Sequence, residues 1–196
     1  MGHAPLPLSA TSTFGLLERF RRGDQSAFTQ LFEKYRRRLA VLIHYKLGEE
    51  ARRALEVDDL LQDTFLRACR DLGKFSYASP GSFFRWLASI ADHVVIDAVR
   101  SRERAKRRAA APVETEPVDS KTPSRLLAEK QRAAALIDAL DQLPGQYRSV
   151  ILLAKIEGLS TGQVAERLGK SREATALLLH RALKRLKTLS TGKERR

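Results

Sequence analysis

Apolar residues recur at intervals of three and four along most of this chain, and this spacing limits the folds it can adopt to helical ones. No segment alternates apolar and polar residues for long enough to predict a strand. An amphipathic helix has to bury its apolar stripe against another element. We therefore predict an all-α protein of two small helical domains joined by a flexible linker, the second domain containing a helix-turn-helix.

Four helices are predicted in the first half of the chain. Each combines a periodic apolar stripe with residues that favour a helix start or end. The third helix covers about residues 57–72. The residues expected to begin or end these helices are Gly23, Asp24, Gly73, and the pair Ser79 and Pro80 as cap and first turn.

The composition changes abruptly after the fourth helix. The segment AAAPVETEPVDSKTPS, residues 109–124, has no spaced large apolar residues and is rich in Ala, Pro, Thr and acids. Such a segment is typical of a flexible linker. The predicted organisation is a flexible tail at 1–12, a first domain at 13–108, a linker at 109–129, a second domain at 130–190 and a basic tail at 191–196.

The second domain ends in a pattern of short helix, tight turn and longer helix. Ser160 can cap a helix that carries Val164 and Ala165, Gly169 can adopt the left-handed conformation of the turn, and Ser171 can cap the next helix. Ala165 is small enough to let the two helices cross closely. A second helix presented in this way fits the major groove of DNA. An ordinary helical hairpin within a bundle is the alternative.

The net charge of +13 indicates a polyanionic partner. Nucleic acid is the first candidate and an acidic membrane surface the second. No stretch approaches the roughly 18 apolar residues of a spanning helix, and the start of the chain lacks the pattern of a secretory signal. We therefore expect a cytoplasmic protein with no membrane insertion. Cys69 is the single cysteine, so we predict no internal disulfide and no thiolate metal cage, and expect Cys69 to be a small buried residue. We also expect no cofactor.

The outward face of the last helix supplies candidate DNA contacts. Arg172 and Glu173 near its start are able to read guanine and cytosine edges, although Glu173 is equally explained as a favourable charge in the first turn. The middle of the helix offers only methyl contacts, and its later residues suit phosphates. The candidate set is Ser171, Arg172, Glu173, Ala176, Leu177, His180, Arg181 and Lys184.

An acidic stripe marks the third predicted helix of this basic protein. Asp59, Gln62 and Asp63 stand at i, i+3 and i+4 and so share a face, while the large apolar residues point largely the other way. Three interpretations are open: a Mg²⁺ site, a solvated acidic face, and a docking face for another protein. The metal site is the least favoured, because the other nearby carboxylates, Asp92 and Asp97, are five residues apart and lie on different faces.

Aromatic and basic residues lie close together around the start of the fourth predicted helix. Aromatic faces can hold unstacked bases while basic groups follow the nucleic-acid backbone. Phe83 and Trp86 alone are explained as ordinary core residues, and Tyr77 and Phe84 are the exposed candidates.

Five motifs in order give the chain a resemblance to the sigma-70 family of RNA polymerase sigma factors, in its extracytoplasmic-function (ECF) class. The resemblance covers about residues 14–108 and 130–188. The motifs are GDQSAFTQLFEKYRRRL, VDDLLQDTFLRACRDL, SFFRWLASIADHVVIDAVRSRERAKR, ALDQLPGQYRSVILLAKIEGLSTGQVAERLGKS and LLHRALKRLK.

The resemblance implies roles for three sets of residues. The helix-turn-helix set matches the reader of the minus-35 element. The set matching the grip on the β′ coiled coil of core RNA polymerase is Asp58, Asp59, Leu61, Gln62 and Asp63. The set matching the part that opens and reads the minus-ten element is Phe75, Ser76, Tyr77, Phe84, Arg85, His93, Arg100 and Arg104.

The resemblance also implies partners. These are core RNA polymerase, through its β′ coiled coil and β flap, promoter DNA, and as a further candidate an anti-sigma factor. We expect a monomer without catalytic activity. The loop KFSYASPGSF lacks the small acidic-glycine sequence usual in the family, and the recognition helix also departs from it, so the promoter sequence is not implied. A free-standing helix-turn-helix regulator is the alternative function, although no dimerisation heptad is evident.

Overall fold

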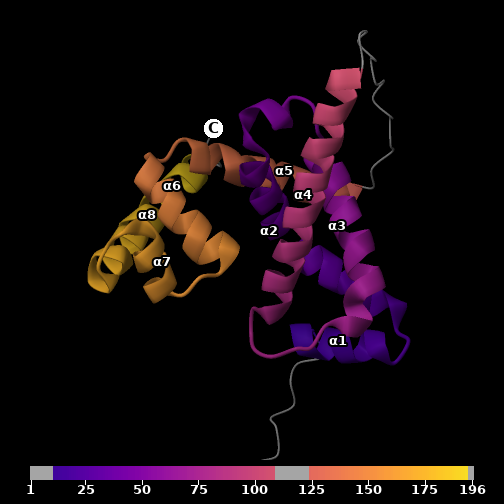
Figure 1. Cartoon of the computed structure of the whole chain (residues 1–196). Helices are drawn as coiled ribbons and strands as arrows, with labels where there is room; N and C mark the ends of the chain where they lie inside the picture. The colour runs from indigo at the N-terminus through magenta and orange to yellow at the C-terminus, as the bar shows by residue number, and fades with distance from the viewer. Residues whose placement is uncertain (1–10, 109–123, 194–196) are drawn as a thin grey trace, which may run out of the picture.

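The computed structural model describes residues 11–108 and 124–193, and in these residues it is built from helices without a strand (Figure 1). The all-α prediction is thereby confirmed. Most of the predicted N-terminal tail and linker, and residues 194–196 of the predicted basic tail, lie outside the described residues, whereas residues 191–193 belong to the end of α8. The elements are α1 (Thr13–Arg21), α2 (Gln25–Arg52), α3 (Val57–Asp71), η1 (Leu72–Lys74), α4 (Ser82–Arg108), α5 (Ser124–Asp141), α6 (Gly145–Ile151), η2 (Leu152–Glu157), α7 (Thr161–Leu168) and α8 (Arg172–Lys193).

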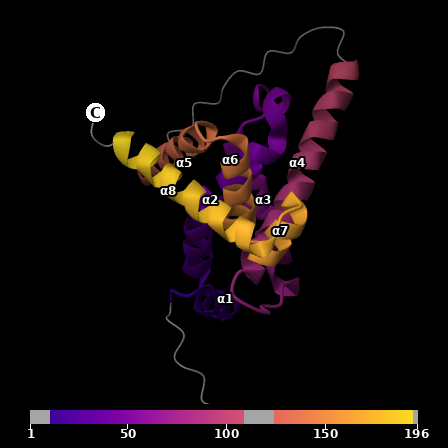
Figure 2. The same cartoon turned by 90° about the vertical axis from the view of Figure 1, so that its left-hand side faces the viewer.

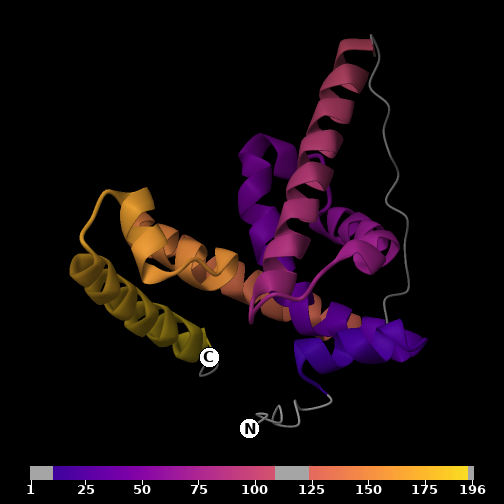
Figure 3. The ribbon, with the colours of Figure 1, turned by 60° about the horizontal axis from the view of Figure 1, so that its bottom comes forward.

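Helices α1 to α4 form the first domain around one apolar core. Helix α2 packs against α1, α3 and α4, and α3 also packs against α4. The end of α4 projects beyond the other helices of this domain (Figures 1 and 3). The largest fully buried side chains of the domain come from all four helices and include Leu16, Leu31, Ile43, Leu61 and Leu87.

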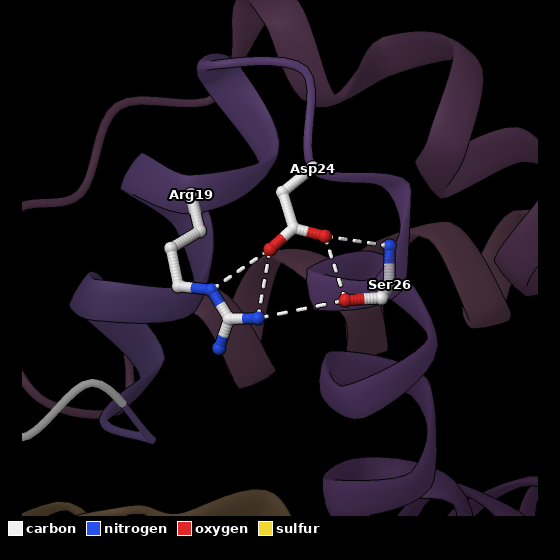
Figure 4. Close-up of polar contacts among 3 residues, drawn as sticks. All are labelled: Arg19, Asp24 and Ser26. Atoms are coloured by element: carbon white, nitrogen blue, oxygen red, sulfur yellow. Dashed lines mark hydrogen bonds and ion pairs between the residues drawn. The ribbon is translucent and has the colours of Figure 1, made fainter.

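The predicted cap of α2 is present (Figure 4). One carboxylate oxygen of Asp24 accepts hydrogen bonds from the backbone N–H of Ser26, at 3.0 Å, and from its hydroxyl, at 2.6 Å. The other accepts from the Arg19 guanidinium at 2.7 and 2.9 Å. These bonds, first the Ser26 hydroxyl and then Arg19, lower the pKa of Asp24. Asp24 therefore fixes both the start of α2 and its junction with α1.

Two of the predicted helix ends are wrong. Helix α3 ends in the 3₁₀ turn η1, where the Phe75 N–H donates to the Leu72 carbonyl at 3.1 Å, so no left-handed Gly73 is needed. Helix α4 begins at Ser82 and not at Ser79 and Pro80. Gly81 has a φ of +88°, which a right-handed helix cannot contain, and the helix therefore starts only after it.

Helices α5 to α8 form the second domain (Figure 2). Helix α5 begins at Ser124, so residues 124–129, the end of the predicted linker, are helical. The sequence from Leu126 onward is rich in Leu, Ala, Glu, Lys and Gln, which favour a helix over an irregular linker. The second domain contacts the first, because α5 and η2 both pack on α2.

Among the described helices, none is both long enough and apolar enough to span a lipid bilayer.

Candidate functional site

The acidic stripe lies on the outer face of α3. Asp59, Gln62 and Asp63 are exposed, and none of them forms an ion pair or hydrogen bond with another side chain in residues 11–108 or 124–193. Leu66, one turn further along the same face, is 56% exposed. Sequence reasoning missed Leu66 because it searched this face for charge, although spacing from Gln62 and Asp63 places Leu66 there. The face combines acidic groups with an apolar side chain.

Two residues of the predicted docking set are less exposed than the other three. Leu61 is 1% exposed and lies in the core of the first domain, so it is not part of the exposed face that Asp59, Gln62 and Asp63 form. Its position two residues after Asp59 turns it away from the acidic stripe. Asp58 is half-buried and forms ion pairs with Arg36, at 3.0 Å, and with Lys130 of α5.

The remaining carboxylates considered for metal binding are also in ion pairs. On α4, Asp92 forms an ion pair with Lys46 at 2.7 Å, and Asp97 accepts a hydrogen bond from Arg67 at 2.9 Å. No group of three metal-ligating side chains occurs in the part of the chain that the structure describes. These two carboxylates of α4 are thus used in ion pairs, whereas Asp59 and Asp63 on the outer face of α3 are not, among the described residues.

The aromatic residues around the start of α4 are mostly core residues. Phe75 is 7% exposed, with its ring centroid 5.4 Å from that of Phe83 and 5.0 Å from that of Trp86. Phe84 is 0% exposed and lies beneath the guanidinium of Arg38, whose Cζ is 3.5 Å from the ring centroid. The prediction that Phe84 is exposed is therefore wrong, because the first turn of α4 packs inward. In this conformation the rings of Phe75 and Phe84 both lie below the surface.

Three predicted minus-ten residues in and just after the loop before α4 are at least partly exposed. Ser76 is exposed, and Tyr77 is half-exposed with its ring in an edge contact with Phe14 at 5.4 Å. Arg85 is exposed and donates to the Ser79 hydroxyl at 3.3 Å. Tyr77 is thus the aromatic residue of the predicted set that stays within reach of a base.

The outward face of α4 is basic towards its end. Arg100 and Arg104 are exposed, and the Nε of Arg104 donates to the Arg100 carbonyl at 3.3 Å. His93 is exposed, with its Nδ1 2.7 Å from the Ser89 carbonyl oxygen. These three predicted residues lie on an accessible helix that extends from the Tyr77 loop (Figure 3).

The predicted helix, turn, helix arrangement is present in α7 and α8. The Ser160 hydroxyl accepts from the Gln163 N–H at 3.4 Å while the Gln163 side chain accepts from the Ser160 N–H at 3.0 Å, which forms a capping box. Gly169 adopts a φ of +61° and ends α7. Val164 and Ala165 are buried against the domain core. The expected capping and core residues of this unit are therefore confirmed.

The predicted DNA-reading residues all lie on the exposed face of α8 and the turn before it. Gly162 of α7 leaves room for the Arg172 guanidinium, whose Nε and Nη2 lie 3.3 Å from where a Cβ at Gly162 would stand. The backbone N–H of Glu173 itself and then the Ser171 hydroxyl lower the pKa of the Glu173 carboxyl, which fits a charge in the first helical turn. The exposed set is Ser171, Arg172, Glu173, Ala176, Leu177, His180, Arg181 and Lys184.

Sequence reasoning missed Thr175 on this helix. Thr175 is 1% exposed, and its hydroxyl donates to the Ser171 carbonyl at 2.8 Å. It lies between the exposed residues at 174 and 176 and anchors the exposed face of α8 without belonging to it. Its spacing of seven residues from buried Ala182 was the available signal.

Comparison of the sequence with models of known families gives a match that covers both helical domains. A family model described as ECF sigma factor matches residues 11–190. The chain belongs to the ECF sigma factor family. This match spans both domains and includes the outer face of α3, the loop before α4 and the helix-turn-helix.

The curated relatives are named as RNA polymerase sigma factors. The chain is 32% identical over 175 residues to the ECF RNA polymerase sigma factor BldN of Streptomyces coelicolor, covering 89% of this chain and 64% of BldN. It is 32% identical over 179 residues to the RNA polymerase sigma factor CarQ of Myxococcus xanthus, covering 88% of this chain and 94% of CarQ. The chain thus spans less than two thirds of BldN and nearly all of CarQ.

Among solved structures, the chain is similar to CnrH in complex with the cytosolic domain of CnrY. The identity is 27% and the TM-score 0.41, with 90% of this chain and 96% of the matched chain covered. It is also similar to the RsbN–BldN complex, with 26% identity, a TM-score of 0.34, and coverage of 88% of this chain and 98% of the matched chain.

Proposed function

We propose that this ECF sigma factor is a promoter-specificity subunit that docks on core RNA polymerase through the outer face of α3. The observation that carries this proposal is the exposed set of Asp59, Gln62, Asp63 and Leu66 in a chain of net charge +13. Acidic side chains without partners in the described residues suit a basic surface on another protein, because complementary charge steers association and fixes register. The neighbouring Leu66 adds apolar area to the same contact.

Two further surfaces would bind promoter DNA in the cytoplasm. The Tyr77 loop and the basic end of α4 would engage the minus-ten element, with Tyr77 stacking on an unpaired base and Arg100 and Arg104 contacting phosphates. The start of α8, led by Arg172, would enter the major groove of the minus-35 element. These two surfaces account for the basic character of the chain, and neither requires a catalytic group.

Run-off transcription tests the proposed function directly. Core RNA polymerase is incubated with the DNA upstream of this protein's own gene and with other candidate promoters, with and without the protein. We expect start sites that depend on the protein. Transcripts that do not change on its addition, over all templates, would contradict the assignment.

A charge reversal tests the docking face separately. Asp59→Lys with Asp63→Lys should abolish co-purification with core polymerase, because it places like charges against a basic partner without touching the core. A matched control is Glu103→Lys with Glu166→Lys, which changes the net charge equally at two exposed positions of α4 and α7. Circular dichroism checks that both proteins are folded. Equal retention of the two variants on core polymerase would refute the docking assignment.

A further inference from the structure

Arg172 is the first residue of α8, and the backbone is held on both sides of it. The Ser171 hydroxyl accepts from the Ala174 N–H at 3.1 Å. The Ser171 carbonyl accepts from the Thr175 N–H at 3.0 Å and from its hydroxyl at 2.8 Å. Across residues 11–108 and 124–193, in contrast, the Arg172 guanidinium forms no hydrogen bond or ion pair. Polar contacts therefore fix the root of this side chain but not its charged end.

The charged end of Arg172 lies against the first turn of α7. Helices α7 and α8 pack on one another (Figure 2). The Nε and Nη2 of Arg172 lie 3.3 Å, and its Cζ 3.5 Å, from the point where a Cβ at Gly162 would stand. One side of the guanidinium, and not a single atom at its tip, thus covers this glycine. In a guanidinium group Nη1 stands opposite this side, so its two N–H donors face away from Gly162.

The backbone of α7 does not itself require a glycine at position 162. Gly162 lies inside the helix and does not have a positive φ. Glycine is a poor helix former, so its presence there weakens α7. Gly145, in the first turn of α6, also lacks a positive φ, but a Cβ at that position would meet no neighbouring group of the described residues within 4 Å. The guanidinium that covers Gly162 is the feature that distinguishes the two positions.

We propose that Gly162 is a positioning residue for base recognition, whose missing side chain leaves a seat that holds the Arg172 guanidinium towards one guanine of the upstream element. The inference rests on the proposed reading of that element by α8 and deepens it. The seat limits the rotamers of an exposed arginine before DNA is bound. Fewer rotamers are then lost on binding, which favours the contact.

The seat matters for a base contact because such a contact requires accurate placement. A bidentate arginine donates to O6 and N7 of the same guanine. Both hydrogen bonds need donor–acceptor distances of about 2.7–3.2 Å, so a small displacement of the guanidinium weakens one or both. A methyl group at position 162 would be too close to two nitrogens of Arg172 and would impose such a displacement.

A graded series at position 162 tests the seat in the full-length chain. Gly162→Ala adds a methyl group, and Gly162→Leu fills the space that the guanidinium now covers. Gly145→Ala is the matched control, because it makes the same change in the first turn of another helix where the space is open. Each substitution replaces a poor helix former, so thermal melts should show no loss of stability. Both Gly162 variants are also combined with Arg172→Ala.

Base discrimination is measured with core polymerase and each variant. The probes are the promoter found by run-off transcription and duplexes that carry single base-pair changes in its upstream element. Discrimination at one G·C pair should fall about twofold in Gly162→Ala, and about fivefold or more in Gly162→Leu, as in Arg172→Ala. Gly145→Ala should behave as the wild type.

The combined variants show whether Gly162 acts through Arg172. If it does, neither Gly162 substitution should change discrimination further in the Arg172→Ala background. A further loss in that background, unchanged discrimination in Gly162→Leu, or a loss that is uniform over all upstream sequences would overturn the seat. A wild-type protein that directs no transcript, or whose transcripts do not depend on the upstream element, would instead refute the proposed function.

Discussion

Phe84 provides a test that separates a core residue from a DNA contact. Its ring is fully buried, lies 3.5 Å from the Arg38 guanidinium and is 5.9 Å from the ring of Tyr35. The substitution Phe84→Ala would leave a cavity at the junction of α2 and α4 and would remove the ring beneath a partly buried cation. The effect should therefore be on folding stability first.

The expected loss follows from the burial of this ring. Replacing a buried Phe by Ala costs about 3–5 kcal/mol. We expect about 4 kcal/mol here, because the loss of the contact with Arg38 adds to the cavity. For a domain of about 100 residues, each kcal/mol lowers the melting temperature by about 4–8 °C, so Tm should fall by roughly 16–32 °C.

Urea unfolding followed by circular dichroism measures this loss. The control is Tyr77→Ala, which removes a half-exposed ring with one edge contact to Phe14 and should cost about 1 kcal/mol. In an assay of promoter opening at low temperature, where both proteins are folded, only Tyr77→Ala should show a specific defect. If Phe84→Ala were as stable as the wild type within about 1 kcal/mol and yet failed to open DNA, the core assignment would be refuted.

Three further substitutions test local features. Gly158→Ala should lower stability by about 1–3 kcal/mol, since its φ of +78° is strained for Ala and its Cβ would meet Arg38; an unchanged thermal melt would contradict the described turn. Ser160→Ala should cost about 1 kcal/mol in the same melt through loss of the capping box, and a loss near zero would mean that the box contributes nothing. Arg172→Ala should change discrimination at the upstream element by about 1–3 kcal/mol in binding assays with altered promoters, whereas a uniform loss over all sequences would identify a phosphate contact.

Local signals in the sequence were sufficient for the helices and their caps. Asp24, Ser160 and Gly169 act within one turn of their own positions, and each plays the role predicted for it. The two predictions about helix ends that failed, at Gly73 and at Ser79, involve loops whose conformation depends on how α3 and α4 pack. A cap depends on backbone hydrogen bonds within one turn of the residue, whereas the conformation of a loop depends on how the helices that it joins are packed.

Burial was harder to predict in α4, where apolar residues on two different faces of the helix are both buried. Phe83 and Phe84 are consecutive, and on an isolated helix only one of them would face a single neighbour. Helix α4 packs against both α2 and α3, and the Arg38 guanidinium covers the second ring, so both are buried. A cation 46 positions earlier in the chain is not visible in the periodicity of α4, which is why Phe84 was expected to be exposed.

The polar contacts between the two domains also could not be predicted from helical periodicity. Residue type alone would place Tyr45, Lys130 and Asp58 at the surface. Tyr45 bonds to Asp141 and Lys130 pairs with Asp58, and both partners are too far away in the sequence for a helical period to link them. Asp58 was assigned to polymerase docking through the family resemblance, and the structure adds that it is already paired with the second domain. Arg36 and Lys130 each pair with a different carboxylate oxygen of Asp58, and the position of Asp58 next to Asp59 in the sequence reveals neither contact.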